Sequence, residues 1–119
     1  SALSVVESLL KLFTRLDRGR LPCELIPLQA DQEIELSREL VCRTTATRHT
    51  VPSLGFVIYE RRNKLKPELA HLSGTEIRDL KLSGAAITNE TRLPIVAYTG
   101  DTAPAGLDNC PDMYRAEIL

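Results

Sequence analysis

A carboxylate follows directly after an apolar segment that is predicted to be a buried strand. Residues 94–98 form a short apolar run, Pro-Ile-Val-Ala-Tyr, and Gly100 then allows a sharp turn because glycine has no Cβ. Asp101 is therefore expected at the end of a rigid strand, on a loop where a hard carboxylate suits a divalent metal. The alternative is that Asp101 and Thr102 form only a turn or a helix cap, which is the commoner role of these residues after glycine.

His49 is the second candidate metal ligand. It lies in the loop between two predicted strands, 40–47 and 54–59, which are rich in β-branched and aromatic residues. This places it close to a strand end, although a single loop histidine is more often an ordinary surface residue than a ligand. His71 is the other histidine of the chain, and we expect it on the surface.

Residues 61–84 are more basic than the rest of the chain. Between Arg61 and Lys81 there are six Lys or Arg and three acidic residues. The residues 73–76, Ser-Gly-Thr-Glu, form a capping box that predicts a short helix, and Gly84 is a plausible stop. A solvated connection between strands is the usual role of such a charge run, whereas a patch that contacts phosphates is the functional alternative. The candidate nucleic-acid contacts are Arg61, Arg62, Lys64, Lys66, Arg78 and Lys81.

The remaining elements are predicted from hydrophobic spacing. A capping box at Ser4 and Glu7 precedes an amphipathic helix, which we expect to cover one face of the domain. Short strands are predicted at 23–27, 32–36 and 85–88, and a loop at 103–112. The apolar residues at 116, 118 and 119 suggest the beginning of a further buried strand.

Length, charge and cysteine usage bound the protein class. A chain of 119 residues with 43% hydrophobic and 26% charged residues is at most one ordinary globular domain. Its net charge of −1 implies no general attraction to nucleic acid, so any basic surface must be local. Three scattered cysteines without a Cys-x-x-Cys pair favour free thiols in a reducing compartment, the cytoplasm or alternatively an organelle. No apolar run is long enough to span a membrane, and we expect no membrane partner.

Several separated segments together resemble one enzyme family. Residues 48–58 and 97–102 resemble segments of tRNase Z, the tRNA 3′-processing endonuclease of the metallo-β-lactamase superfamily. The intervening residues 61–68, 72–77 and 80–84 resemble the insertion of this family. The similarity is greatest to short-form enzymes of plant and cyanobacterial type. It runs from about residue 5 to 119 and is weak before Arg43.

The resemblance implies a fold, a metal site and a substrate. It implies an α/β fold that is part of a metallo-β-lactamase αββα sandwich, with part of one or both sheets, an N-terminal helix and an inserted arm over 61–84. The residue at the place of His49 binds one zinc ion in the family, and the catalytic aspartate at the place of Asp101 bridges two. It further implies that the arm grips precursor tRNA and that the protein is a homodimer.

The sequence departs from the family in its metal ligands. The His-x-His-x-Asp-His signature is absent, so His49 and Asp101 supply at most two of the three or four ligands that a zinc site needs. We therefore expect residues 1–119 to be a single partial domain, an interior piece of a longer enzyme, with exposed sheet edges and an uncovered apolar face. Alone, it should bind zinc weakly or not at all and should not cleave RNA.

Two other functions remain open at this stage. The chain could be a non-catalytic RNA-binding or interaction module in which the basic arm is the functional surface. It could also belong to a superfamily enzyme that hydrolyses small esters or phosphodiesters. The arm argues against this last hypothesis, because a small substrate needs no distant grip.

Overall fold

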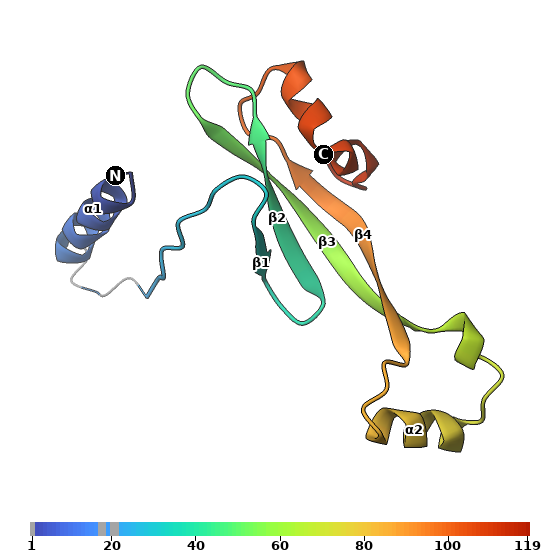
Figure 1. The fold of residues 1–119 in the computed structure, drawn as a ribbon. Coiled ribbons are helices and arrows are strands. Elements are labelled where there is room, and N and C mark those ends of the chain that lie inside the picture. The colour runs from blue at the N-terminus through green and yellow to red at the C-terminus, as the bar shows by residue number, and fades with distance from the viewer. Residues whose placement is uncertain (1, 17–18, 20–21) are drawn as a thin grey trace.

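A single antiparallel sheet organises the molecule. The structure is a computed structural model that describes residues 2–16, 19 and 22–119. Its strands follow one another in the order β1-β2-β3-β4, so the sheet is a simple meander (Figure 1). The predicted α/β class is confirmed, and the sheet is compatible with part of a metallo-β-lactamase sandwich. In chain order the elements are α1 (Ala2–Leu16), β1 (Glu33–Glu35), β2 (Leu40–Thr47), β3 (Ser53–Leu65), the 3-10 helix η1 (Pro67–Leu69), α2 (Gly74–Leu82), β4 (Thr88–Tyr98) and the 3-10 helices η2 (Pro104–Asn109) and η3 (Pro111–Arg115).

The two longest strands extend well beyond the part that was predicted from the sequence. β2 has the predicted bounds, but β3 continues to Leu65 and β4 begins at Thr88, ten residues before its end. The pairing of β3 with β4 runs from Phe56 opposite Tyr98 to Leu65 opposite Thr88, with an irregularity next to Tyr59. The strand predicted at 23–27 is absent, and of the strand predicted at 85–88 only Thr88 lies in a strand, as the first residue of β4.

One face of the sheet is covered by the segment that follows β4. Val57, Tyr59 and Ala97 alternate onto this face and pack against Met113 of η3, which is 1% exposed, and against Cys110. Gly55 belongs to the same face, and a Cβ there would lie 2.5 Å from the terminal carbon of Met113. Glycine thus allows η3 to lie close to the strand. The segment 103–112, which was predicted to be a loop, is therefore part of a packed layer formed by η2 and η3.

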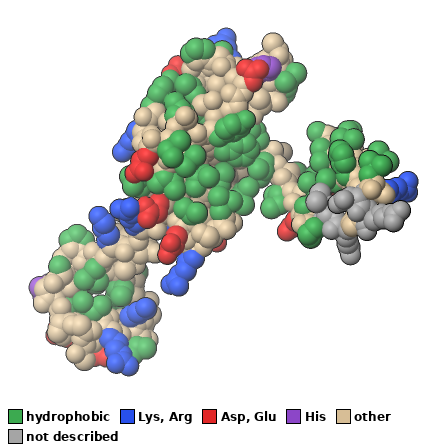
Figure 2. Space-filling view, turned by 180° about the vertical axis from the view of Figure 1, so that it is seen from behind, with side chains coloured by type: hydrophobic (Ala, Val, Ile, Leu, Met, Phe, Trp, Pro, Cys, Tyr) green, Lys and Arg blue, Asp and Glu red, His purple; other side chains and the backbone are tan. Residues whose placement is uncertain are grey.

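The opposite face of the sheet is apolar and only partly covered. Phe56, Ile58 and Val96 alternate onto it and are half-buried. Hydrophobic side chains gather over the middle of the molecule in Figure 2. The expectation of an uncovered apolar face is therefore met only in part, because these described side chains are half-buried and not fully exposed.

α1 is a helix, as predicted, but it covers no face of the sheet. The helix already includes Ala2, so Ser4 lies inside it, and the predicted cap at Ser4 is wrong. None of its described residues is buried, and Phe13 is 60% exposed. α1 stands apart from the sheet in Figure 1. No helix in the described part of the chain combines the length and apolarity that crossing a bilayer requires.

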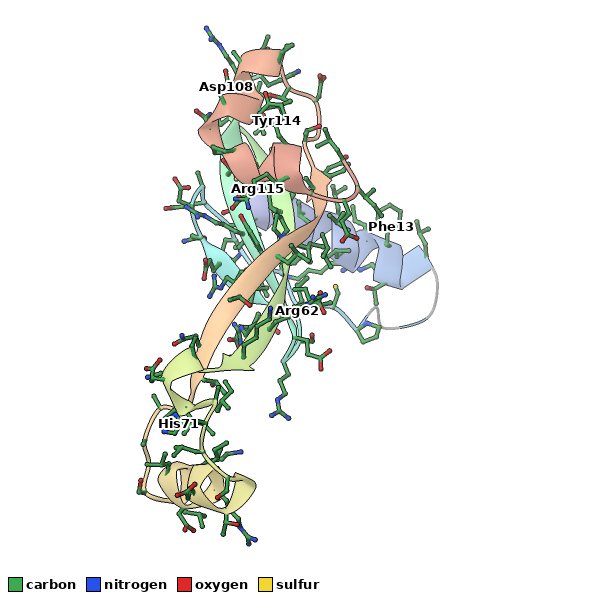
Figure 3. The ribbon with its side chains drawn as sticks, turned by 90° about the vertical axis from the view of Figure 1, so that its right-hand side faces the viewer. Phe13, Arg62, His71, Asp108, Tyr114 and Arg115 are labelled. Atoms are coloured by element: carbon green, nitrogen blue, oxygen red, sulfur yellow. The ribbon has the colours of Figure 1, made fainter. Side chains whose placement is uncertain are left out.

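The arm projects from the far end of the sheet. Its first residues continue β3, and the paired residues 61–65 and 88–92 form a two-stranded ribbon that leads to η1 and α2 (Figures 1 and 3). The radius of gyration is 20.3 Å, whereas a compact chain of this length has about 13 Å. The predicted capping box is confirmed, with Ser73 accepting from the Glu76 nitrogen and the Glu76 carboxylate accepting from the Ser73 nitrogen.

Candidate functional site

Antiparallel topology brings the two candidate ligands to the same end of the sheet. β3 runs away from the loop that joins it to β2, and β4 runs back toward that loop. The last β2–β3 pair is Thr47 with Ser53, and β4 ends at Tyr98 opposite Phe56. The loop over 48–52 and the segment after Tyr98 are therefore neighbours, although they are about 50 residues apart in the sequence.

His49 and Asp101 meet at this rim. His49 Nε2 lies 2.9 Å from Asp101 Oδ2, and His49 Nδ1 lies 3.2 Å from Thr50 Oγ1. Gly100 has a φ of +61°, a value that glycine adopts without strain, and this turn lets the chain present Asp101 beside the histidine. The predicted convergence of these two residues on one rim is what the structure has.

The pair is open to solvent and incomplete as a metal site. The Asp101 side chain is 89% exposed and that of His49 is 30% exposed. An imidazole nitrogen and a carboxylate oxygen are both suitable zinc donors. However, no group of three or more His, Cys, Asp or Glu that could hold a metal ion exists among the described residues. The donor chemistry therefore fits zinc, but the residues that the structure describes bring together only two suitable donors.

Residues that were not predicted to be metal ligands hold the two loops together. The Arg48 nitrogen donates to Thr102 Oγ1 at 2.9 Å, and the Arg48 oxygen accepts from the Ala103 nitrogen at 2.8 Å. Asn109 Nδ2 donates to the Ala46 oxygen at 2.9 Å, which attaches η2 to the end of β2. Only the position of Thr102 directly after the candidate aspartate could have indicated such a role.

The six basic residues proposed to contact nucleic acid fall into two groups. Arg61 bonds Glu35 at 2.8 Å and lies 3.4 Å from Glu90, and its side chain is only 18% exposed. Arg62 binds Glu60 through two nitrogens, at 3.0 and 2.6 Å. Both arginines lie in the ribbon at the base of the arm and are neutralised there; Figure 3 shows Arg62 at this junction.

The other four cations carry no such partner. No acidic group of the described residues lies within 4.0 Å of Lys64, Lys66, Arg78 or Lys81, the distance that defines the ion pairs elsewhere in the chain. Lys64 lies near the end of the ribbon, Lys66 precedes η1, and the other two lie on α2. His71 lies on the arm, far from the rim, as expected (Figure 3).

The three cysteines are free among the described residues. Cys42 and Cys110 are buried and Cys23 is exposed. Burial raises the pKa of the Cys42 thiol. Free thiols are what the odd number and wide spacing of the cysteines predicted.

The chain is similar to plant tRNase Z proteins. It is 43% identical over 116 residues to "tRNase Z TRZ2, chloroplastic" and 39% identical over 116 residues to "tRNase Z TRZ1", both of Arabidopsis thaliana. It is 45% identical over 85 residues to "Nuclear ribonuclease Z" of Triticum aestivum. These similarities cover 96%, 96% and 71% of this chain, and no family model matches it.

The similarity reaches only part of each relative. The matched segments make up 33%, 41% and 48% of the three proteins, so the chain spans a third to a half of their length. Within that span, the relatives bear out the family that the segments around His49, the arm and Asp101 indicated. The chain is therefore homologous to part of tRNase Z.

Proposed function

We propose that this chain is part of a zinc-dependent endoribonuclease that removes the 3′ trailer from precursor tRNA. The observation that carries the proposal is the meeting of His49 and Asp101, 2.9 Å apart at the rim of the sheet. Antiparallel topology brings the two loops to this rim, and within it the imidazole and the carboxylate face each other, as two ligands of one metal site would. The names of the relatives, two called tRNase Z and one called ribonuclease Z, support the same reaction.

The metal site would be shared between this chain and donors outside it. His49 Nε2 and Asp101 Oδ2 would hold zinc, and the remaining ligands would come from the part of the enzyme that this chain does not span. When bound, zinc supplies a Lewis acid that stabilises charge developing on the phosphodiester. The open rim leaves room for an RNA end, because the Asp101 side chain is 89% exposed.

The arm would hold the tRNA at a distance from the reacting phosphate. Four of its cations have no ion-pair partner in the described part of the chain, and they lie near the ribbon end, before η1 and on α2: Lys64, Lys66, Arg78 and Lys81. Double-stranded RNA is gripped mainly through phosphates and 2′-hydroxyls, which requires shape and positive charge. The rim and the arm lie at opposite ends of β3, so one RNA could contact both (Figure 1).

The two histidines allow a matched test of the metal site. We expect zinc to bind the 119-residue chain weakly, and His49→Ala and Asp101→Asn should each abolish that binding in calorimetry. His71→Ala is the control, because His71 lies on the arm, and it should leave the binding unchanged. Tight binding of two zinc ions by the isolated chain, or equal sensitivity to the His71 substitution, would overturn the proposed site.

The ribonuclease activity is tested on the complete enzyme of which this chain is proposed to be a part. Its reading frame should contain the missing His-x-His-x-Asp-His ligands, and the complete protein should cut a precursor tRNA at its 3′ side. Charge reversal at Lys64 and Lys66 should weaken tRNA binding but spare hydrolysis of a small phosphodiester. Equal loss of both activities would contradict a separate tRNA-binding surface on the arm.

We further propose that the complete protein is a homodimer of the cytoplasm or an organelle, which sedimentation and cell fractionation would test.

A further inference from the structure

The loop that carries His49 is fixed to the segment that carries Asp101 through the backbone of one residue. Arg48, directly before His49, uses both of its backbone polar groups in this contact. Its nitrogen donates to Thr102 Oγ1 at 2.9 Å, and its oxygen accepts from the Ala103 nitrogen at 2.8 Å. Thr102 Oγ1 also donates to the Arg48 oxygen at 3.3 Å. The residue before one candidate ligand is therefore bonded to the residue after the other.

Gly106 packs against the same pair of atoms. It is buried in η2, and a Cβ at this position would lie 2.6 Å from the Arg48 nitrogen and would overlap Thr102 Oγ1. These two atoms form one hydrogen bond, so a methyl group would intrude on that bond. The neighbouring backbone cannot yield as a flexible side-chain end would. Glycine is thus required here for close approach and not for an unusual φ.

The His49–Asp101 contact cannot hold the two loops by itself. Exposed pairs of this kind contribute about 0–1 kcal/mol, because water solvates both groups and the side chains lose freedom. A metal site, however, needs its ligands held to within about 0.5 Å by supporting residues. The bonds of Arg48, against which the buried Gly106 packs, are described contacts that can provide this support.

We propose that Thr102 and Gly106 are positioning residues that fix His49 and Asp101 in the relative placement a shared metal requires. We call the contacts of Arg48 with Thr102 and Ala103, closed by Gly106, the rim latch. This proposal rests on the metal site proposed above for its purpose, but the latch itself is a property of the apo chain. It can therefore be tested without zinc.

Hydrogen exchange measured by NMR on the 119-residue chain tests the latch directly. In Thr102→Val, which keeps the shape but loses the hydroxyl, the Arg48 amide should exchange about tenfold faster, the effect of losing one net hydrogen bond. Gly106→Ala should give at least as large an increase. In both variants the nuclear Overhauser contact between the His49 ring and the Asp101 methylene protons should weaken or disappear.

Two controls separate positioning from general damage. Thr102→Ser restores the hydroxyl and should return the Arg48 amide and the His49–Asp101 contact to the wild-type values. Gly74→Ala is the matched glycine control, because a Cβ at Gly74 meets nothing within 4 Å, and it should change neither quantity. The Val57 amide, in the buried core, reports whether a variant is folded.

The outcomes distinguish a failure of this positioning proposal from a failure of the proposed metal site. If Thr102→Val and Gly106→Ala loosen Arg48 but leave the His49–Asp101 contact intact, the latch does not position the ligands and the inference fails. It also fails if Thr102→Ser behaves like Thr102→Val. If the latch behaves as expected while zinc leaves the His49 resonances unshifted at every concentration, the proposed metal function fails and the latch stands.

Discussion

The two ends of β3 differ in how their residues are held. At the rim, two loops are joined through the backbone of Arg48, and η3 packs on the adjoining sheet, where Met113 is almost fully buried. In the arm, no residue of η1 or α2 is buried, and the structure depends on ribbon pairing and on the capping box at Ser73. One strand therefore connects a packed end to a solvated end.

The difference matches the two tasks proposed for the chain. Metal ligands must be held in a fixed geometry, which packing and hydrogen bonds between the two loops provide. Phosphate contacts need positive charge within reach, and exposed side chains on a projecting ribbon supply it. Substitutions at the rim end should therefore change stability and geometry, whereas those in the arm should change binding and its salt dependence.

The largest expected effect is on the stability of the packed end. Met113→Ala removes a side chain that is 1% exposed and leaves a cavity beneath Val57 and Tyr59. Such a substitution lowers the free energy of unfolding by roughly 2–5 kcal/mol. Urea unfolding followed by circular dichroism measures it. Ile77→Ala, at a half-buried position of α2, is the comparison and should cost clearly less. An equal cost would mean that the arm and the sheet are packed alike.

The second effect concerns the charge of the solvated end. Neutralising Lys64 or Lys66 to Gln should lower the slope of log affinity against log salt for precursor tRNA by about 1 each, because each phosphate contact releases counterions. Fluorescence anisotropy over a range of salt concentrations measures this slope. Lys11→Gln on α1 is the matched control, since this lysine lies outside the arm, and it should leave the slope unchanged.

Local sequence patterns correctly predicted those elements whose bounds do not depend on contacts with distant parts of the chain. The bounds of β2, the cap of α2 at Ser73 and the turn at Gly84, whose φ is +84°, follow from alternation, capping chemistry and the freedom of glycine. The convergence of His49 and Asp101 came from a family resemblance, because spacing alone cannot bring residues 52 positions apart together. Antiparallel topology then explains that convergence.

Other features depend on contacts that a single sequence does not display. The ribbon makes β3 and β4 longer than predicted, because Arg61 and Arg62 pair with carboxylates on other residues and so tolerate a strand environment. Gly106 and Thr102 matter through close approach to Arg48, which lies more than 50 residues earlier. Conversely, the periodicity of α1 predicted a buried stripe, but periodicity does not identify the surface that covers it.

A smaller effect follows from the paired arginines at the base of the arm. Arg62 already binds Glu60 through two nitrogens, so Arg62→Gln should change the salt slope of tRNA binding by less than half of the effect of Lys64→Gln. Glu60→Gln is the informative counterpart, because it frees the guanidinium and should steepen the slope by up to about 1. A large loss of slope in Arg62→Gln would show that Arg62 leaves Glu60 to contact RNA, and would weaken the division of the six cations into two groups.

The smallest effect is the pH dependence of α2. Hydrogen bonds from the Ser73 backbone and side chain hold the pKa of Glu76 below its ordinary value of 4.5. Because the folded pKa is the lower one, this contribution is complete above 4.5 and is lost as the pH falls through the folded value. Amide exchange in α2 should therefore accelerate at acid pH relative to exchange in β2. Glu76→Gln keeps an acceptor without the titration, and so it should remove this pH dependence. If α2 in the Gln variant still loosens at acid pH, other carboxylates hold the arm together, and the capping box is not what separates its stability from that of the sheet.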